Sequence, residues 1–286
     1  MLDVQNLQVA YGGVVAVRDI SLSVQPGQIT AVLGANGAGK TTTLLGISGL
    51  VKTRAGHVEF EGSRITGTAP ERIARLGIAH VPAGRGIFPG LSVADNLRMG
   101  LYGAGRDGDT QAVEEVLDAF PILRERRAQA AGTMSGGQQQ QLAIGRALVQ
   151  RPKLLMLDEM SMGLSPTVVS DLFALVRRLA DDGMAVVMVE QFVGQALKVA
   201  DQAVVIEQGT VAAAGKPSEL SAEDIGAAYL GSESGAELPR APRDARQQVP
   251  VSLAGVDVRK LERMAAEQGR TVDELTQEIL EKALGS

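Results

Sequence analysis

The sequence predicts an α/β domain with a largely parallel sheet, followed by a second, much smaller unit. Short runs rich in Val and Ile alternate with helix-length segments over residues 1–231, the pattern typical of βαβ units. The polar, proline-containing stretch 232–248 then indicates a linker, and periodic apolar residues return over 249–286. With 286 residues, the chain is long enough for one large core and a small additional unit.

The overall composition excludes several classes of protein. The chain has no Cys, which excludes disulfides and thiolate metal sites, and we expect its two histidines, His57 and His80, to be structural. A formal net charge of −5 argues against a broadly basic nucleic-acid coat. The longest apolar run, 184–189, is far shorter than the about 20 residues of a spanning helix, and the N-terminus lacks a secretory signal pattern. We therefore expect an intracellular protein that does not span a bilayer.

The elements of the larger domain follow from the apolar pattern. Short apolar runs predict buried strands, and they lie at 14–17, 29–33, 154–157, 185–189 and 203–206. Helix-length segments predict helices that begin at Thr41 and span 139–149, 166–181 and 192–200. The stretch from about 92 to 150 has few strand signals, which predicts a helical subdomain inserted into the α/β domain.

A glycine-rich loop joins the predicted strand 29–33 to the helix that follows it. Residues 34–41, GANGAGKT, match the phosphate-binding pattern G-x-x-x-x-G-K-[ST]. Glycines allow successive backbone N–H groups to point at anionic oxygens, and the helix N-terminus adds the positive end of its dipole. We expect Lys40 to contact the β- and γ-phosphates of a nucleotide and the Thr41 hydroxyl to ligate Mg²⁺. The candidate phosphate-binding residues are Gly34, Asn36, Gly37, Gly39, Lys40, Thr41 and Thr42. An accidental glycine turn is the alternative.

Two acids end the apolar run 154–157. We expect Asp158 to hold Mg²⁺, directly or through water, and Glu159 to act as general base on an attacking water. An exposed acidic turn is the alternative interpretation of these two residues alone. The phosphate-binding loop in the same chain favours the first interpretation.

A third motif precedes the predicted helix 139–149. Residues 134–138, MSGGQ, place Ser135 where its hydroxyl could bond a phosphate oxygen at a helix N-terminus. Within one chain this segment has no obvious phosphate to bind. A Ser N-cap followed by a Gly-Gly turn is therefore the favoured interpretation of the motif on its own.

Together and in this order, the three motifs resemble the ATP-binding cassette (ABC) ATPases over residues 1–231. The resemblance implies a P-loop NTPase cassette fold that hydrolyses ATP to ADP and phosphate with Mg²⁺. It also implies that two cassettes pack head to tail over two ATP molecules. The residues that would then contact the ATP of the opposing subunit are Ser135, Gly136, Gly137 and Gln138. Tyr11 falls where the family has an adenine-stacking aromatic, with local strand packing as the alternative, and 161–165 resembles the segment that crosses the interface.

Within that family, the chain resembles the branched-chain and hydrophobic amino-acid importer subgroup at 81–89, 189–191 and 227–231. This resemblance implies a peripheral subunit on the cytoplasmic face of the plasma membrane, bound to two permease subunits around 83–89 and the helical subdomain. It also implies a second cassette, of the same or a different chain, and an external solute-binding protein. Relatives that handle urea, amides or lipids share much of the pattern, so the solute stays open. The alternatives are a soluble regulatory or assembly ATPase without permease and a nearly inactive ATP sensor.

Three residues depart from the usual family pattern. Ala83 stands where most cassettes have Gln and this subgroup often has Glu, so its side chain cannot touch Mg²⁺ or the attacking water. Gln191 stands in the place of the switch His; it can donate a hydrogen bond to phosphate without a charge, and we assign it to the catalytic set with Glu159. Met160 replaces the usual Pro. These departures predict ATP binding with slow or partner-dependent hydrolysis.

The C-terminal segment 249–286 follows a different template. A short alternating run at 249–253 precedes two apolar-faced helices, and the second opens with the capping box at 271–274. This order resembles the ribbon-helix-helix family, and so small a unit is expected to self-associate or to dock on a partner. The segment has five basic and seven acidic residues, which disfavours DNA binding. A DNA contact and a simple helical hairpin are the alternatives.

Overall fold

The computed structural model describes residues 1–105, 108–221, 223 and 225–226. The chain divides into two units, Met1–Gly235 and Ala236–Ser286, and all described residues belong to the first. The predicted linker 232–248, the ribbon-helix-helix-like segment 249–286 and the subgroup-like residues 227–231 lie outside the described residues.

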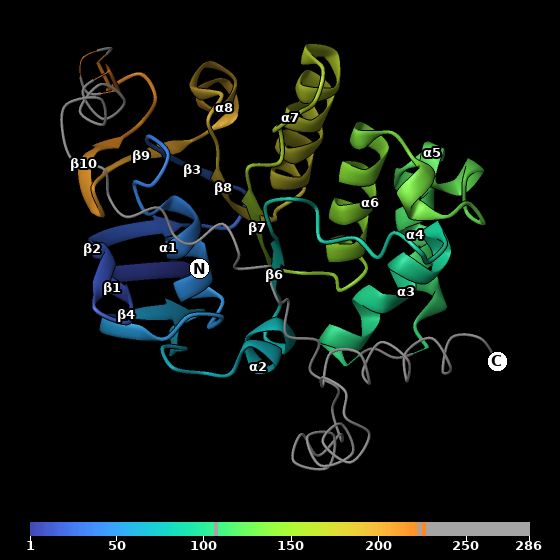
Figure 1. Ribbon diagram of the computed structural model, residues 1–286, viewed down its shortest axis with the longest axis horizontal. Helices are drawn as coiled ribbons and strands as arrows, with labels where there is room; N and C mark the ends of the chain where they lie inside the picture. The colour runs from blue at the N-terminus through green and yellow to red at the C-terminus, as the bar shows by residue number, and fades with distance from the viewer. Residues whose placement is uncertain (106–107, 222, 224, 227–286) are drawn as a thin grey trace, which may run out of the picture. The chain divides into compact units, whose positions relative to one another are not determined.

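One ten-stranded sheet runs through the described part of the chain (Figure 1). Its strand order is β5-β4-β1-β2-β10-β9-β3-β8-β7-β6. The strands are β1 (Leu2–Tyr11), β2 (Val14–Val24), β3 (Ile29–Leu33), β4 (Thr53–Phe60), β5 (Ser63–Arg64), β6 (Ile78–Val81), β7 (Leu154–Asp158), β8 (Ala185–Val189), β9 (Gln202–Glu207) and β10 (Thr210–Gly215).

The sheet is mixed, so the prediction of a largely parallel sheet was wrong for its N-terminal part. Strands β9, β3, β8, β7 and β6 pair in parallel, whereas β1 pairs antiparallel with both β2 and β4, and β10 pairs antiparallel with β9. The physical reason is one-sided burial. Every residue of β3, β7 and β8 is buried, but buried and exposed positions intermingle along β1 and β2. Polar residues interrupt the apolar runs of β1 and β2. The sequence therefore predicted only residues 14–17, the start of β2, as a strand in this part of the sheet.

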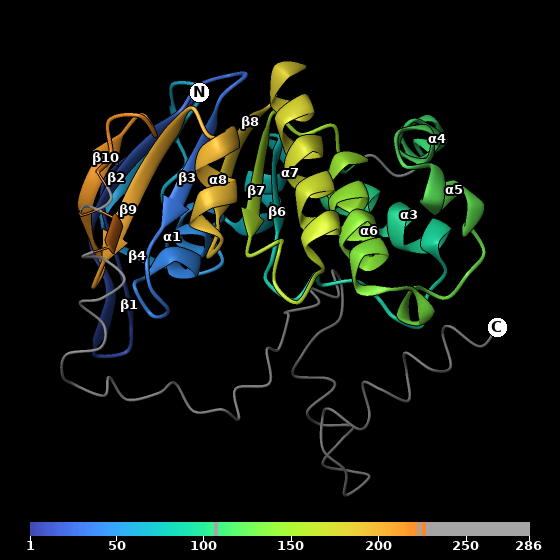
Figure 2. The same cartoon turned by 90° about the horizontal axis from the view of Figure 1, so that it is seen from above.

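The helices flank the sheet and form a separate cluster beside it. They are α1 (Lys40–Ile47), α2 (Pro70–Arg75), α3 (Val93–Ala104), α4 (Thr110–Ala119), α5 (Pro121–Glu125), α6 (Gly136–Leu148), α7 (Pro166–Asp181) and α8 (Val193–Val199), with a 3₁₀ turn at Ala131–Thr133. Helices α3 to α6 occupy the chain between β6 and β7, the stretch for which a helical subdomain is predicted. Helices α3, α4 and α5 lie beyond α6, on its far side from the sheet (Figure 2).

The core has two parts, one on each face of the sheet. Leu155 and Leu157 of β7 pack with the buried residues of α6, α7 and α8, whereas Met156 of the same strand packs with Leu44 and Ile47 of α1. Burial on both faces explains why the central strands are continuous apolar runs. Within the described residues, no helix combines the length and the apolar character that crossing a membrane requires.

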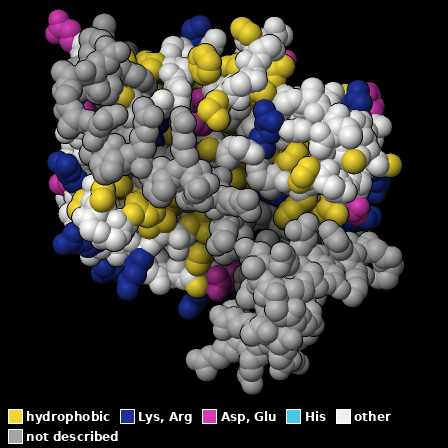
Figure 3. Space-filling model, viewed as in Figure 1, with side chains coloured by type: hydrophobic (Ala, Val, Ile, Leu, Met, Phe, Trp, Pro, Cys, Tyr) yellow, Lys and Arg dark blue, Asp and Glu magenta, His cyan; other side chains and the backbone are white. Residues whose placement is uncertain are grey.

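Charged side chains protect the antiparallel edge of the sheet. Arg54 of β4 and Arg64 of β5 are exposed at this edge, and Lys and Arg side chains gather on the same side in Figure 3. Charged residues at an edge strand disfavour pairing with a further strand from another molecule. The edge is therefore a poor place for sheet extension.

Helices α3 and α6 approach so closely at Gly100 that no larger residue fits. A Cβ atom added to Gly100 would lie 2.2 Å from the carbonyl oxygen of Arg146 and 2.5 Å from a methyl carbon of Val149. We expect Gly100→Ala to lower the free energy of unfolding by about 1–3 kcal/mol, because the helices must move apart. Circular dichroism melting should detect a fall of roughly 2–12 °C, since 1 kcal/mol shifts the melting temperature of a domain of this size by about 2–4 °C.

The matched control is Gly194→Ala in α8, where an added Cβ meets nothing within 4 Å. This control should leave the melting temperature unchanged or raise it, because Ala is the better helix former by up to about 1 kcal/mol. An equal effect of the two substitutions would contradict the assigned α3–α6 contact.

Candidate functional site

The phosphate-binding loop curls around its own lysine. It leaves the end of β3, and the lysine is the first residue of α1. The Lys40 ammonium donates hydrogen bonds to the carbonyl oxygens of Gly34 (2.9 Å) and Ala35 (3.0 Å). A Cβ at Gly34 would lie 2.2 Å from the carbonyl oxygen of Ile206, so only glycine fits the start of the loop. Of the other candidates, Asn36, Gly37 and Gly39 belong to the same loop, and Thr41 and Thr42 to the first turn of α1.

Strand β2 and the turn between β9 and β10 hold the loop from behind. Gly39 has a φ of 105°, and a Cβ there would lie 2.8 Å from the carbonyl oxygen of Ala16 in β2. The N–H of Gly209 donates to the carbonyl oxygen of Ala38 at 2.9 Å. Sequence reasoning missed Gly209; the only signal for it was a glycine turn directly after a predicted strand.

Three carboxylates surround the lysine. Burial lowers the pKa of Lys40, and the negative charges of Glu159, Asp158 and Glu190 oppose that shift. The whole Lys40 residue is only 4% exposed. It is therefore a buried positive charge at the junction of the loop with the acidic ends of β7 and β8.

Asp158 is tied to the loop through Thr41. The Thr41 hydroxyl donates a 3.0 Å hydrogen bond to the Asp158 carboxylate, which is almost fully buried. Burial raises the pKa of Asp158 to about 6, against the opposing effect of hydrogen bonds from Thr41 and from the backbone of Ala83. Although the side chain of Ala83 carries no polar group, its backbone N–H thus reaches the carboxylate.

The two predicted catalytic residues and the loop form one hydrogen-bonded chain. The Gln191 side-chain amide donates to the Glu159 carboxylate at 3.0 Å and to the side-chain oxygen of Asn36 at 2.9 Å. Glu159 has a φ of 48°, and its backbone N–H donates to the carbonyl oxygen of Val189 at 2.9 Å. Residues from three separate parts of the sequence therefore converge above the loop. Met160, next along the chain, is buried in the core.

The donor set beside the lysine fits Mg²⁺. Thr41 offers a hydroxyl oxygen and Asp158 a carboxylate oxygen, and the two are already in hydrogen-bond contact. Mg²⁺ prefers oxygen ligands and commonly binds through one or two protein groups, with phosphates and water completing its coordination. Among the described residues, no group of three or more His, Cys, Asp or Glu side chains could form an all-protein metal cage. The residues present suit an ion shared with a phosphorylated ligand.

The MSGGQ motif lies at the start of α6, in the helical cluster. Ser135 is the N-cap, and it forms a complete capping box with Gln138, so the helix begins at Gly136 rather than at 139. A Cβ at Gly137 would lie 2.7 Å from a methyl group of Val168 in α7. The hydrogen bonds of Ser135 run to Gln138 and Gln139 of its own helix. Within the single chain, Ser135 is therefore an N-cap, and none of these hydrogen bonds reaches the phosphate-binding loop.

Tyr11 lies at the end of β1, opposite Val14 of β2. Its side chain is exposed, with 47% of its surface accessible, so it is not committed to local packing. The position leaves the ring free to meet a flat ligand.

A buried acid that sequence reasoning did not single out lies next to Gln191. Glu190 is fully buried, and it accepts hydrogen bonds from the Ser161 hydroxyl and from the Ser161 N–H (3.3 Å). Burial raises the pKa of Glu190 to about 7. The pair connects the end of β8 with the segment that follows Glu159.

The raised pKa of Glu190 makes stability depend on pH. The folded pKa of about 7 exceeds the ordinary value of 4.5, so the unfolded chain loses this proton first as pH rises. The contribution to stability is therefore complete below pH 4.5 and is lost as pH rises towards 7. We expect the Glu190→Gln variant to gain about 3 kcal/mol relative to the parent across this window. Denaturant unfolding at pH 5 and 7.5 measures the difference, and the exposed Glu125→Gln should show none.

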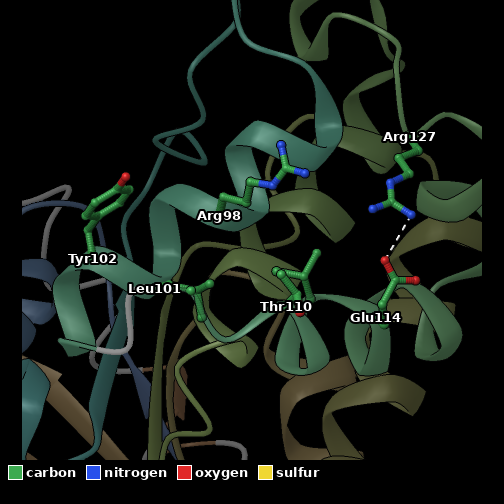
Figure 4. A pocket seen from close by; sticks show the side chains of 8 residues that line it. Arg98, Leu101, Tyr102, Thr110, Glu114 and Arg127 are labelled. Carbon is green, nitrogen blue, oxygen red and sulfur yellow. Dashed lines mark ion pairs between the residues drawn. The ribbon is translucent and has the colours of Figure 1, made fainter.

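The helical cluster holds a separate cavity of about 140 Å³ between α3 and α4. Its wall includes Leu101, Val113 and an ion pair of 2.9 Å between Arg127 and Glu114 (Figure 4). None of the residues that line it belongs to the motifs described above. The cavity is therefore distinct from the site around the loop.

Comparison with known proteins gives one consistent family. Residues 17–162 match the family model described as ABC transporter. The chain is 44% identical over 211 residues to the high-affinity branched-chain amino acid transport ATP-binding protein BraG of Pseudomonas aeruginosa, covering 74% of this chain and 91% of BraG. It is 35% identical over 238 residues to the lipopolysaccharide export system ATP-binding protein LptB of Escherichia coli, covering 81% of this chain and 98% of LptB.

The fold comparison agrees with the sequence comparison. A crystal structure of the ADP conformation of an ATP-binding cassette from an ABC transporter superposes with a TM-score of 0.68 at 27% identity. The match covers 79% of this chain and 93% of that cassette.

Proposed function

Because the chain belongs to the ABC transporter family of ATP-binding subunits, we propose that it drives an importer of branched-chain or other hydrophobic amino acids. The chain is an ABC ATPase, and its reaction is ATP hydrolysis coupled to transport. The observation that carries the solute class is the 44% identity to BraG over 91% of that relative.

In this proposal the loop binds the nucleotide. Its backbone N–H groups and the start of α1 receive the phosphates, and Lys40 exchanges its bonds to the loop carbonyls for the β- and γ-phosphate oxygens. Thr41 and Asp158 hold Mg²⁺, which when bound supplies positive charge to the phosphate oxygens. Tyr11 stacks on the adenine from the exposed end of β1.

Hydrolysis uses the chain of residues above the loop. Glu159 accepts a proton from the attacking water as the oxygen bonds to the γ-phosphorus and the bond to the β–γ bridging oxygen breaks. Gln191 already donates to Glu159, and its amide hydrogens are within reach of both that carboxylate and the loop. It positions the base and donates to the γ-phosphate. The products are ADP and phosphate.

The separation of the MSGGQ motif from the loop supports a two-cassette site. In this arrangement Ser135, Gly136, Gly137 and Gln138 contact the ATP held by a second cassette, of the same or a different chain. Two permease subunits receive the motion at the cytoplasmic face of the membrane, and a solute-binding protein delivers the solute. Self-association of 249–286 joins two copies of the chain. Hydrolysis is slow or partner-dependent, because Ala83 offers no side-chain contact to Mg²⁺ or the attacking water, Gln191 carries no charge and Met160 replaces the usual Pro.

The proposal is tested by purifying the tagged chain from gently solubilised native membranes and identifying the associated chains by mass spectrometry. We expect two permease chains, and either a second cassette or this chain alone as the ATPase. Recovery with lipid-exporting permeases, as the likeness to LptB allows, would overturn the solute class. Recovery of this chain alone, or with chromatin, would favour the soluble regulatory ATPase.

A further inference from the structure

The segment that joins β6 to α3 is fastened to the helical subdomain at three places. The Arg85 guanidinium donates a 2.7 Å hydrogen bond to the side-chain oxygen of Gln139 in α6. The fully buried Asn96 of α3 accepts from the N–H of Phe88 (2.8 Å) and donates to its carbonyl oxygen (2.9 Å). Arg146 of α6 lies over the Phe88 ring, 5.2 Å from its centroid. From Arg85 onward, these contacts should make the segment move together with the helical subdomain.

The other end of the same segment belongs to the candidate nucleotide site. The backbone of Ala83 hydrogen-bonds the Asp158 carboxylate. Only Gly84 separates that bond from Arg85. The link between the buried carboxylate and the helical subdomain is thus three residues long.

The backbone of this link is bent in an unusual way. Gly84, Arg85 and Gly86 have successive φ angles of 80°, 72° and 59°. The left-handed region is ordinary for glycine and unfavourable for arginine. A non-glycine residue held in this strained conformation suggests that the residue has a function beyond stabilising the fold.

The side chain of Arg85 ends at the start of the MSGGQ helix. A Cβ at Gly136 would lie 2.9 Å from an Arg85 guanidinium nitrogen, so the two are in close contact. Gln139, which accepts from Arg85, in turn donates to the carbonyl oxygens of Ala131 (3.3 Å) and Met134 (3.1 Å). Arg85 therefore holds both the first turn of α6 and the turn before Ser135.

The location is also electrostatically unfavourable for an arginine. The N-terminus of a helix carries partial positive charge, which disfavours a cation beside it. A neutral residue would satisfy the fold with less strain and less repulsion. Backbone strain and electrostatic repulsion both disfavour an arginine at position 85. Its presence there suggests that the long side chain and the several N–H donors of the planar guanidinium are needed.

We propose that Arg85 is a positioning residue that sets the orientation of Ser135–Gln138 according to the state of the Ala83–Asp158 contact. This inference rests on the two-cassette arrangement of the proposed function. When the nucleotide site closes, the backbone at Gly84–Gly86 moves, and Arg85 transmits this movement to the first turn of α6.

The test uses the full chain carrying Glu159→Gln, which is expected to retain bound ATP. Into this parent we place Arg85→Gly, which removes the side chain and also relieves the backbone strain. Arg85→Lys keeps one donor towards Gln139. The matched control is Arg151→Gly, since Arg151 is a second arginine with a positive φ (48°) and lies outside the candidate site.

Three quantities are measured on each protein: the melting temperature, the affinity for a fluorescent ATP analogue at dilute protein concentration, and the increase in self-association with MgATP over MgADP by sedimentation velocity. The last quantity subtracts any self-association of 249–286 that is independent of ATP. The ATPase kcat and KM of the same Arg85 variants are measured with Glu159 intact.

We expect Arg85→Gly to keep its melting temperature and to bind the ATP analogue within about twofold of the parent. Its ATP-dependent association should weaken by about tenfold, the value of one hydrogen bond to a charged group, and kcat should fall with KM nearly unchanged. Arg85→Lys should lie between Arg85→Gly and the parent, and Arg151→Gly should associate like the parent.

Parent-like association of Arg85→Gly would overturn the inference and leave the proposed function standing. Loss of melting temperature and of nucleotide affinity in both Arg85 variants would also overturn it, because Arg85 would then be structural. Absence of any ATP-dependent association in the parent itself would instead contradict the two-cassette arrangement, and the inference would fall with it.

Discussion

Replacement of Glu159 by glutamine is expected to lower kcat for ATP hydrolysis by about 10²–10⁴-fold, the usual contribution of a general base. The variant keeps a side chain of the same size that can still meet Gln191, which bonds Glu159 at 3.0 Å. Removing a negative charge near the γ-phosphate should leave ATP affinity unchanged or increase it. Phosphate release under steady-state conditions, with binding of a fluorescent ATP analogue, measures both quantities.

The control for this prediction is Glu125→Gln, which removes an exposed carboxylate at the end of α5. It should hydrolyse ATP at the rate of the unaltered chain. Hydrolysis within about threefold of normal in Glu159→Gln would exclude Glu159 as the base. The search for the base would then turn to Glu190, which acts on Lys40 through its charge and is not assigned to Mg²⁺ as Asp158 is.

Replacement of Lys40 by methionine is expected to weaken ATP binding by about 10²–10³-fold, the usual effect of losing a buried charged contact. Two causes act together. The phosphates lose their buried positive charge, and the loop loses the bonds from Lys40 to the carbonyl oxygens of Gly34 and Ala35. The three carboxylates around Lys40 are also left unbalanced, so binding of the negatively charged triphosphate chain becomes still less favourable. Titration with a fluorescent ATP analogue measures the change.

Lys52→Met serves as the control for charge, because Lys52 is exposed and lies in the loop after α1. Its affinity for the analogue should equal that of the unaltered chain. Retention of affinity within about threefold in Lys40→Met would contradict a phosphate-binding role for the loop.

Several elements could be predicted because their pattern of burial is regular. The strands predicted at 29–33 and 185–189 and the helix predicted at 166–181 are confirmed with the same bounds in β3, β8 and α7. Both strands are buried along their whole length, so their apolar runs are unbroken, whereas α7 buries one face and shows apolar residues at helical spacing. Strands β1, β4 and β10 were not detected, because each shields only one face and tolerates polar residues between its apolar ones.

In the candidate site, too, some residues could be predicted from the sequence and others could not. The loop, Asp158 and Glu159 have local patterns, because a phosphate needs glycines, a lysine and a hydroxyl at adjacent positions. The Arg85–Gln139 bond joins residues 54 positions apart, and the Ser161–Glu190 bond joins residues 29 positions apart. No spacing in the sequence indicates such pairs, since only the folded chain brings them together. Gln191 was identified through family resemblance, and its bond to Asn36 became apparent only in the fold.

We propose that ATP hydrolysis at Glu159 drives uptake of hydrophobic amino acids. The most direct test is uptake of radiolabelled leucine by cells that lack this chain and carry either the unaltered chain or Glu159→Gln, with both proteins present at equal levels. We expect the unaltered chain to restore uptake and Glu159→Gln not to restore it. Equal uptake in both strains, or no dependence of leucine uptake on the chain at all, would contradict it.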